Sequence, residues 1–181
     1  MQKTSYSQGK EDKGMNRKRE KRLFGILLLC VLLLCACSSK TKEKTPIGNC
    51  SISISCKTIL DHMDELKESK KEFVPEDGWI LKKTEVPFYE DESVYDVLSR
   101  ICQEKKIHME ASISPVYNSS YIEGIGQLYE FDCGKLSGWT YKVNGISPSY
   151  GCSEWKIHDN DEIVWDYTCD LGKDVGVEIG R

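Results

Sequence analysis

The sequence predicts an α+β domain in which short strands form a mixed or antiparallel sheet packed on one main helix. Three segments carry this prediction. Residues 50–57 (CSISISCK) and residues 139–143 (WTYKV) alternate with the period of a strand, whereas residues 94–106 place apolar side chains at helical spacing. Strands on both sides of a single helix are typical of the α+β class.

The segments before the main helix are a strand, a helical stretch and a second strand. After the strand at residues 50–57, residues 58–66 (TILDHMDEL) have apolar residues at helical spacing. Residues 67–78 are rich in charge and end in Pro-Glu-Asp-Gly, a turn pattern. Residues 79–89 (WILKKTEVPFY) predict a strand, in which Pro87 indicates a sheet edge or a strand end.

The main helix is expected to begin at a capping box. Ser93 and Asp96 have the spacing of that motif, with Asp in place of the usual Glu or Gln, and the helix should end near Lys106. Its apolar stripe consists of Val94, Val97, Leu98, Ile101 and Cys102. Residues 107–113 (IHMEASI) alternate again and predict a returning strand.

The remaining segments are predicted to be strands and turns. Residues 121–131 (YIEGIGQLYEF) predict one strand, bent at Gly124 and Gly126. The others are a strand at residues 139–143 closed by an Asn144-Gly145 turn, a hairpin of residues 154–157 and 162–168, and a Gly-rich tail from residue 169.

Length and composition indicate one domain with a tail. The chain has 181 residues, of which 30% are charged and 39% hydrophobic, and its 4 Trp, 9 Tyr and 4 Phe can build a core. Residues 1–37 carry a net charge of +5, and the remainder carries −9. An acidic folded part without a basic stripe predicts no nucleic-acid partner.

The N-terminal segment has the pattern of an export signal. Residues 17–22 (RKREKR) precede an uncharged run at residues 23–36, which is shorter than the roughly 20 residues of a membrane span and is typical of a signal peptide. Leu34-Cys35-Ala36-Cys37 resembles the lipobox of bacterial lipoproteins, which implies that Cys37 is acylated and holds the protein to the lipid bilayer. An ordinary secretory peptide and a signal anchor are the alternatives.

This pattern sets the expected organisation of the chain. Residues 1–37 form the signal peptide up to the lipidated cysteine, and Met15 is an alternative start to Met1. Residues 38–48 form a polar, flexible tether, residues 49–175 the folded domain and residues 176–181 the tail. The expected location is extracytoplasmic, lipid-anchored to the bacterial cell membrane.

Six of the 9 cysteines fall in the folded part, and an even number in an exported chain predicts up to three disulfides. Two of them, Cys50 and Cys56, lie about 20 Å apart in an extended strand, so each needs another partner. A zinc site is the alternative, but the three histidines are scattered singly, and no metal is expected. The disulfide candidates are Cys50, Cys56, Cys102, Cys133, Cys152 and Cys169.

The sequence contains no nucleophile elbow, phosphate loop or dinucleotide fingerprint, so neither enzyme activity nor a cofactor is expected. Aromatic residues gather in the last third instead. Trp139 and Tyr141 share one face of their strand, where they are either core residues or a stacking surface for a planar ligand or a glycan. The ligand-binding candidates are Tyr117, Tyr121, Trp139, Tyr141, Asn144, Pro148 and Tyr150.

Several of these segments match a known family. Residues 138–145 (GWTYKVNG) fit its G-W-x-Y-x-V-N-G segment, and residues 156–165 (KIHDNDEIVW) are similar to its closing D-G-D hairpin, with Asn160 in place of Gly. Over residues 79–168 the sequence resembles the transcobalamin-like C-terminal domain of bacterial surface lipoproteins, a domain of unknown function. The resemblance implies a β-grasp-like fold, in which a sheet curls around one helix.

The resemblance also implies a function, because animal relatives cover one face of cobalamin with this domain. The first expectation is therefore a membrane-tethered, non-catalytic binding module for a soluble ligand, specifically cobalamin or another corrinoid, with a transporter or a second binding subunit as partner. The second is a surface interaction domain that binds protein or cell-wall glycan. A cleft beside Tyr141 and Tyr150 would favour the first and a flat patch the second.

Overall fold

The computed structural model of the protein describes residues 44–115 and 118–177. The predicted signal peptide, the acylated Cys37 and most of the tether lie outside the described residues, as do Tyr117 and the end of the tail. No helix in the described part of the chain has the length and apolar content that crossing a bilayer requires.

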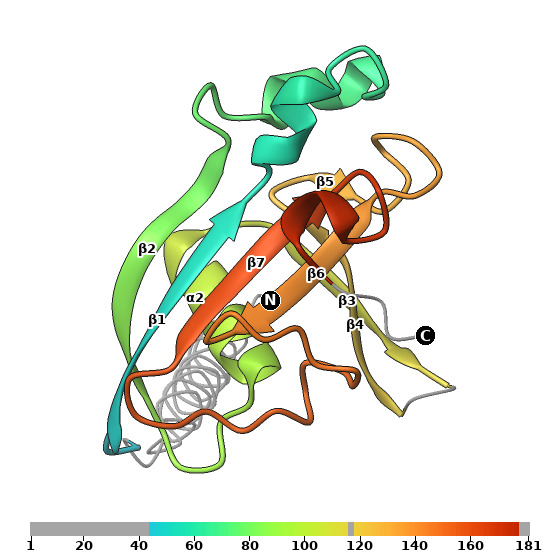
Figure 1. Cartoon of the computed structure of the whole chain (residues 1–181). Coiled ribbons are helices and arrows are strands. Elements are labelled where there is room, and N and C mark those ends of the chain that lie inside the picture. Colours follow the sequence, from blue (N-terminus) through green and yellow to red (C-terminus); the bar gives the residue numbers. More distant parts are fainter. Residues whose placement is uncertain (1–43, 116–117, 178–181) are drawn as a thin grey trace, which may run out of the picture. The chain divides into compact units, whose positions relative to one another are not determined.

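Two sheets and one main helix form the fold (Figure 1). The larger sheet is mixed, because its central strands β1 and β7 run parallel while both outer pairs are antiparallel. It has the order β2-β1-β7-β6, from β1 (Gly48–Ser55), β2 (Trp79–Phe88), β6 (Gly138–Val143) and β7 (Glu162–Thr168). The smaller, antiparallel sheet contains β3 (Met109–Ser114), β4 (Ser119–Ile125) and β5 (Leu128–Tyr129). The predicted α+β class is confirmed.

The main helix, α2 (Val94–Lys105), begins and ends as its sequence predicts. Asp96 N–H donates to Ser93 Oγ over 3.2 Å, and Ser93 N–H donates to Asp96 Oδ2 over 2.8 Å, which completes the capping box. Lys106 ends the helix in the left-handed conformation. All five residues of the predicted apolar stripe are buried in the core.

Strand β1 lies at the centre of the fold. Its apolar residues Cys50, Ile52 and Ile54 are fully buried, and the serines between them are buried as well. The largest fully buried side chains, Trp165 and Tyr167, come from the neighbouring strand β7. The strand pair β1–β7 therefore supplies much of the core to which α2 adds its stripe.

Strands β2 and β6 are the outer strands of the larger sheet. Pro87 lies on β2, which confirms the sheet edge that proline predicted. Strand β6 ends at Asn144 and Gly145, with φ angles of 53° and 77°, so the predicted tight turn is confirmed.

Residues 121–131 do not form the single bent strand that the sequence predicted. Gly126 and Gln127 both have positive φ angles, 61° and 70°, and they reverse the chain so that Ile125 pairs with Leu128. Two consecutive residues with positive φ form the turn of a two-residue hairpin, not a bend. The segment is therefore divided between β4 and β5.

The hairpin predicted for residues 154–157 and 162–168 is also wrong in its first half. β7 forms as expected, but Lys156 makes an isolated bridge with Ser93, because β1 and β6 already occupy both sides of β7. The helical spacing of residues 58–66 yields only a short 3-10 helix, η1 (Lys57–Asp61). The other short helices are η2 (Glu68–Phe73) and η3 (Lys173–Val175).

Candidate functional site

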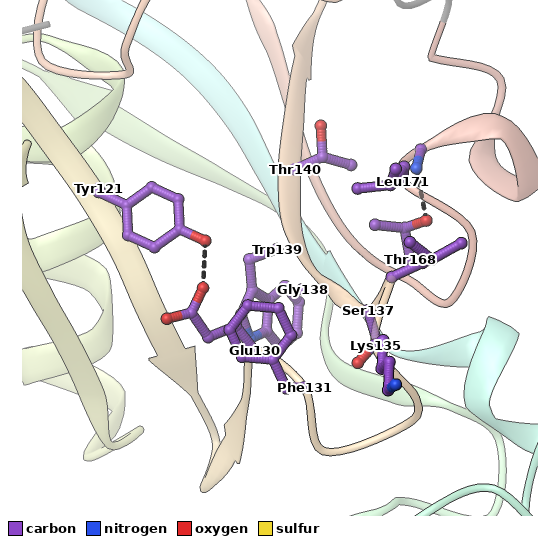
Figure 2. Close-up of a pocket in the computed structure, with 12 residues that line it drawn as sticks. Tyr121, Glu130, Phe131, Lys135, Ser137, Gly138, Trp139, Thr140, Thr168 and Leu171 are labelled. Carbon is purple, nitrogen blue, oxygen red and sulfur yellow. Dashed lines mark hydrogen bonds between the residues drawn. The ribbon is translucent and has the colours of Figure 1, made fainter. Parts of the chain in front are cut away.

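A cavity of about 290 Å³ lies at the outer edge of β6 (Figure 2). Three parts of the chain line it: Tyr121 of β4, residues of the segment Glu130–Thr140, and residues of the segment Thr168–Gly172. We call the second the β5–β6 wall and the third the β7 wall. The two walls are separated in the sequence by the end of β6, the loop that follows it and most of β7, but they meet because β6 pairs with β7.

The rim of the cavity consists of exposed apolar side chains. Phe131 is 56% exposed, Leu171 51%, Leu136 45% and Tyr121 43%. Single exposed apolar residues are ordinary, but several that gather around a concavity are typical of a binding surface. We refer to these four residues as the apolar rim.

Two residues of the apolar rim also have an unfavourable backbone. The φ angle is 61° at Phe131 and 48° at Leu171, in the left-handed region that side chains with a bulky Cβ substituent disfavour. Such a conformation costs on the order of 1 kcal/mol. Folding therefore gains little from either side chain at these positions, since each combines exposure with backbone strain.

The polar groups of the cavity are few and partly paired. The Tyr121 hydroxyl donates to Glu130 Oε2 over 2.6 Å, across the mouth of the cavity (Figure 2). Burial, and then the Glu130 carboxylate, raises the pKa of Tyr121, so this hydroxyl stays a hydrogen-bond donor at neutral pH. Lys135 adds one exposed ammonium group to the lining.

Trp139 forms a fixed part of the lining. Its indole N–H donates to Leu128 O over 2.8 Å, and its ring meets the Tyr167 ring edge to face, with centroids 5.2 Å apart. The side chain is only 9% exposed. It therefore supports the cavity from within the core more than it offers a free stacking face.

The β7 wall is held by hydrogen bonds to the β5–β6 wall and within itself. Leu171 N–H donates to Leu136 O over 2.9 Å, which joins the two walls. Gly172 N–H donates to Thr168 Oγ1 over 2.6 Å, and Thr168 Oγ1 in turn is paired with Asp174. These hydrogen bonds hold the wall while the Leu171 side chain stays about half exposed.

The free edge of β6 offers main-chain groups beside the cavity. Asn144 N–H bonds to Glu162 O over 2.9 Å, and the bonded pairs of an antiparallel ladder alternate. Thr140 and Lys142 therefore bond to β7, while the N–H and C=O groups of Trp139 and Tyr141 point away from it. These groups can form hydrogen bonds with a ligand at the strand edge.

Of the predicted ligand-binding residues that the structure describes, two line the cavity, Tyr121 and Trp139. Tyr141 is buried, its hydroxyl donates to Tyr150 O over 2.9 Å, and burial raises its pKa. Asn144 serves the turn, because its side chain donates to Asp161 Oδ1 over 2.7 Å and accepts from Glu162 N–H over 2.9 Å.

The last two candidates in the described residues, Pro148 and Tyr150, lie in the loop after β6. The exposed Tyr150 ring stacks on Trp155, with centroids 5.8 Å apart and planes at 16°. This pair is a second aromatic surface, separate from the lining of the cavity. Tyr117 lies outside the described residues.

The sequence reasoning missed three residues of the apolar rim: Phe131, Leu136 and Leu171. Leu136 and Leu171 are isolated large apolar residues among Asp, Gly, Lys and Ser in loops, whereas Phe131 ended the strand predicted for residues 121–131. That composition was the available signal, because such a residue gains little burial from a loop on the surface. Nothing local indicated that the two loops would meet.

The six cysteines of the folded part are free thiols in the structure, and all but the half-buried Cys169 are buried. Burial raises the pKa of Cys50 to about 11, and that of Cys56, Cys102 and Cys152 to about 12. These thiols are therefore poor nucleophiles at neutral pH. The described residues contain no group of three or more side chains that could hold a metal ion.

Comparison with known proteins identifies one family. Residues 91–169 match the family model described as Domain of unknown function (DUF4430). No curated protein matches the chain. Among solved structures, the chain is similar to haptocorrin in complex with Cbi, with a TM-score of 0.47 and 13% identity over 75% of this chain and 29% of that chain.

A second solved structure, from Ruminococcus gnavus, is described as a candidate metal-binding protein. It matches with a TM-score of 0.40 and 10% identity, over 67% of this chain and 96% of that chain. None of these descriptions names a catalytic activity. The family match runs from before α2 to the end of β7, and it leaves β1 and β2 outside. The resemblance that the sequence motifs predicted is confirmed: the folded part of the chain contains a DUF4430 domain at residues 91–169.

Proposed function

We propose that the folded part of this protein is a non-catalytic binding module whose ligand occupies the cavity at the edge of β6. The observation that carries the proposal is the state of Phe131 and Leu171. Both combine an exposed apolar side chain with a left-handed backbone, so stability does not explain them. A ligand that covers these side chains would recover about 25 cal/mol for each Å² of apolar surface removed from water.

The size of the cavity constrains the ligand. At about 290 Å³ it lies at the lower limit of small-molecule sites, which span roughly 300–1,000 Å³. A large ligand would insert one edge and lie across the apolar rim with the rest. A planar molecule with an apolar face and polar substituents fits this arrangement, because the free main-chain groups of Trp139 and Tyr141 can pair with those substituents.

A corrinoid has this chemistry, and it is the specific ligand that the sequence motifs imply. One open-sided cavity covers only part of such a molecule. We therefore propose that a second subunit or a transporter covers the other face. The site would work outside the cytoplasm, on a domain held to the bacterial membrane through acylated Cys37 and the polar tether.

The stacked pair Tyr150 and Trp155 favours a second function. Two parallel aromatic rings at a surface are a platform for the apolar face of a sugar ring or for a protein side chain. A surface interaction domain that binds protein or cell-wall glycan would use this pair instead of the cavity.

Calorimetric titration of the full-length chain in detergent with cyanocobalamin tests the first function. We expect a Kd in the micromolar range or lower, weakened about ten-fold by Phe131→Ser and again by Leu171→Ser, because each substitution removes roughly 1–2 kcal/mol of apolar contact. Ile113→Ser is the matched control, since Ile113 is 72% exposed on β3 and does not line the cavity.

The outcomes separate the ligand from the site. Absence of heat at millimolar cyanocobalamin would contradict the corrinoid. A fragment screen by NMR, read at the indole N–H of Trp139, then tests the cavity itself, and a complete lack of fragment binding there would contradict the site. Glycan or protein capture that is lost with Tyr150→Ala, and kept in the Phe131→Ser variant, would establish the second function.

A further inference from the structure

Two of the six thiols, Cys133 and Cys169, lie in segments of the chain that are joined by the hydrogen bond from Leu171 N–H to Leu136 O over 2.9 Å. Burial, and then the neighbouring Cys133 thiol, raises the pKa of Cys169. Cys133 is fully buried and donates to His62 O over 3.4 Å. Cys169 follows β7 directly and is half-buried.

The other four thiols are in a different situation. The shifts in the pKa values of Cys50, Cys56, Cys102 and Cys152 come from burial, from charged side chains and from backbone hydrogen bonds. No other thiol contributes to them in the described part of the chain. The expectation of up to three disulfides stays a prediction, and Cys133 with Cys169 is the pair that the structure favours for one of them.

The backbone around the pair is already fixed on both sides. Cys133 forms an antiparallel bridge with Leu66, and its N–H donates to Ser137 Oγ over 3.1 Å. Cys169 N–H donates to Asp174 Oδ2 over 2.7 Å. The hydrogen bond from Leu171 N–H to Leu136 O holds the two segments side by side, which is the arrangement that a disulfide between them requires.

We propose that Cys133 and Cys169 form a disulfide that ties the two walls of the cavity together. Cys133 lies within the β5–β6 wall, between Phe131 and Leu136, and Cys169 lies within the β7 wall, between Thr168 and Leu171. The two walls are joined by the ladder pair of Gly138 and Thr168 and by the hydrogen bond from Leu171 N–H to Leu136 O. A covalent link beside it would fix the distance between Phe131 and Leu171.

Oxidation balances with a small-molecule disulfide such as oxidised glutathione as the acceptor. Burial raises the pKa of Cys169, so this more accessible thiol reacts at alkaline pH: its thiolate attacks that disulfide, forms a mixed disulfide and releases one thiolate. The Cys133 thiolate then attacks the sulfur of Cys169 and releases the second. Two thiol protons and two electrons leave the protein, and one disulfide is reduced to two thiols.

Peptide mass mapping of the full-length chain is the first test. The protein is incubated with oxidised glutathione, unfolded without reductant and alkylated with N-ethylmaleimide. We expect a linked peptide pair that contains Cys133 and Cys169, with Cys50, Cys56, Cys102 and Cys152 alkylated. Alkylation of all six, or a link from Cys169 to any other cysteine, would overturn the proposal.

Reduction of the wild-type protein provides a second readout without a substitution in the core. The linked form is expected to melt about 10 °C higher, and the amide of Leu171 should exchange its hydrogen at least ten-fold more slowly than in the reduced form. Cys169→Ser is the control, because reduction should leave its melting temperature and its Leu171 exchange unchanged. Equal exchange in the two wild-type forms would show that the link does not hold the walls.

The effect on ligand binding rests on the proposed function, so it is measured separately. Cyanocobalamin affinity should fall about ten-fold on reduction of the wild type and stay constant in Cys169→Ser. A linked protein that ignores cyanocobalamin in both redox states keeps the disulfide and rejects the corrinoid. Corrinoid binding by a protein in which all six thiols stay free would support the proposed ligand and reject the disulfide.

Discussion

Strands β2 and β6 are both outer strands of the same sheet, yet the side chains around their free edges differ in kind. On β2, Lys82 and Lys83 are exposed and paired, with Asp77 over 2.8 Å and with Glu162 over 3.0 Å. Beside β6 lie a cavity and the apolar rim. Charge on an edge strand opposes pairing with other chains, whereas apolar side chains around an edge favour contact with a partner. Under the proposed function, this difference protects β2 from association and leaves the side of β6 for the ligand.

The largest expected effect compares the tryptophans of the two strands. Trp139→Ala on β6 should lower the free energy of unfolding by about 3–5 kcal/mol, because it empties a buried site and removes the bond to Leu128 O. Trp79→Ala on β2 should cost less than about 1.5 kcal/mol, since Trp79 is partly exposed and covered by Lys57. Urea unfolding measures both. Equal losses would mean that the cavity side is no better anchored than the opposite edge.

The next effect concerns how β2 is held to the helix. Arg100 of α2 donates to Pro87 O over 2.7 Å and to Glu92 Oε2 over 3.1 Å. Arg100→Met should cost about 2 kcal/mol, because Glu92 is nearly buried and would lose its partner. In thermal unfolding, the melting temperature of Arg100→Lys should lie between those of the wild type and Arg100→Met, since an ammonium group cannot make the forked contact of a guanidinium. If Arg100→Met unfolds at the same temperature as the wild type, Arg100 does not hold β2 to the helix.

A smaller effect, with the opposite sign, is expected at the apolar rim. Phe131→Asn and Leu171→Asn should leave the free energy of unfolding unchanged or raise it by up to about 1 kcal/mol, because Asn tolerates positive φ. Affinity for the ligand should fall in the same variants. Denaturant unfolding measures the stability of each variant, and titration with cyanocobalamin measures its affinity, both on the same preparation. A clear loss of stability would show that these side chains serve folding after all.

The smallest effect should appear on the charged edge. Lys82→Ala combined with Lys83→Ala is expected to change the unfolding free energy by less than about 0.5 kcal/mol, because exposed ion pairs contribute little. Light scattering of the folded protein should nevertheless rise with concentration, since the edge loses its protection. If the scattering does not change, the lysines of β2 do not protect this edge from association.

Local patterns in the sequence predicted the elements whose causes are local. The capping box at Ser93, the alternation in residues 50–57 and the Asn144-Gly145 turn depend on neighbours within a few residues, and all three appear as expected. The turn at Gly126 and Gln127 was missed because a positive φ at Gln127 is not a property that its residue type favours. Lys156 was assigned to the wrong partner because pairing is decided by competition between strands.

The candidate site was predictable only in part for the same reason. Tyr121 and Trp139 were found as aromatic residues on strands, and both line the cavity. Phe131 and Leu171 acquire their role only when two loops distant in sequence meet beside β6. The segments that carry Cys133 and Cys169 meet for the same reason, so residue spacing left the pairing of these cysteines open.

The parallel pairing of β1 with β7 has a consequence for when the molecule matures. Ser51 of β1 is in register with Glu162 of β7, so the central ladder joins the first strand of the folded part to the last. Contacts between such distant residues slow folding, because a long loop must close before they form. During synthesis, β1 must wait beside β2 with one edge unpaired until the C-terminal strand emerges. Residues 168–172, which line the cavity, follow β7 directly, so under the proposed function the binding site would form last, once β7 has paired.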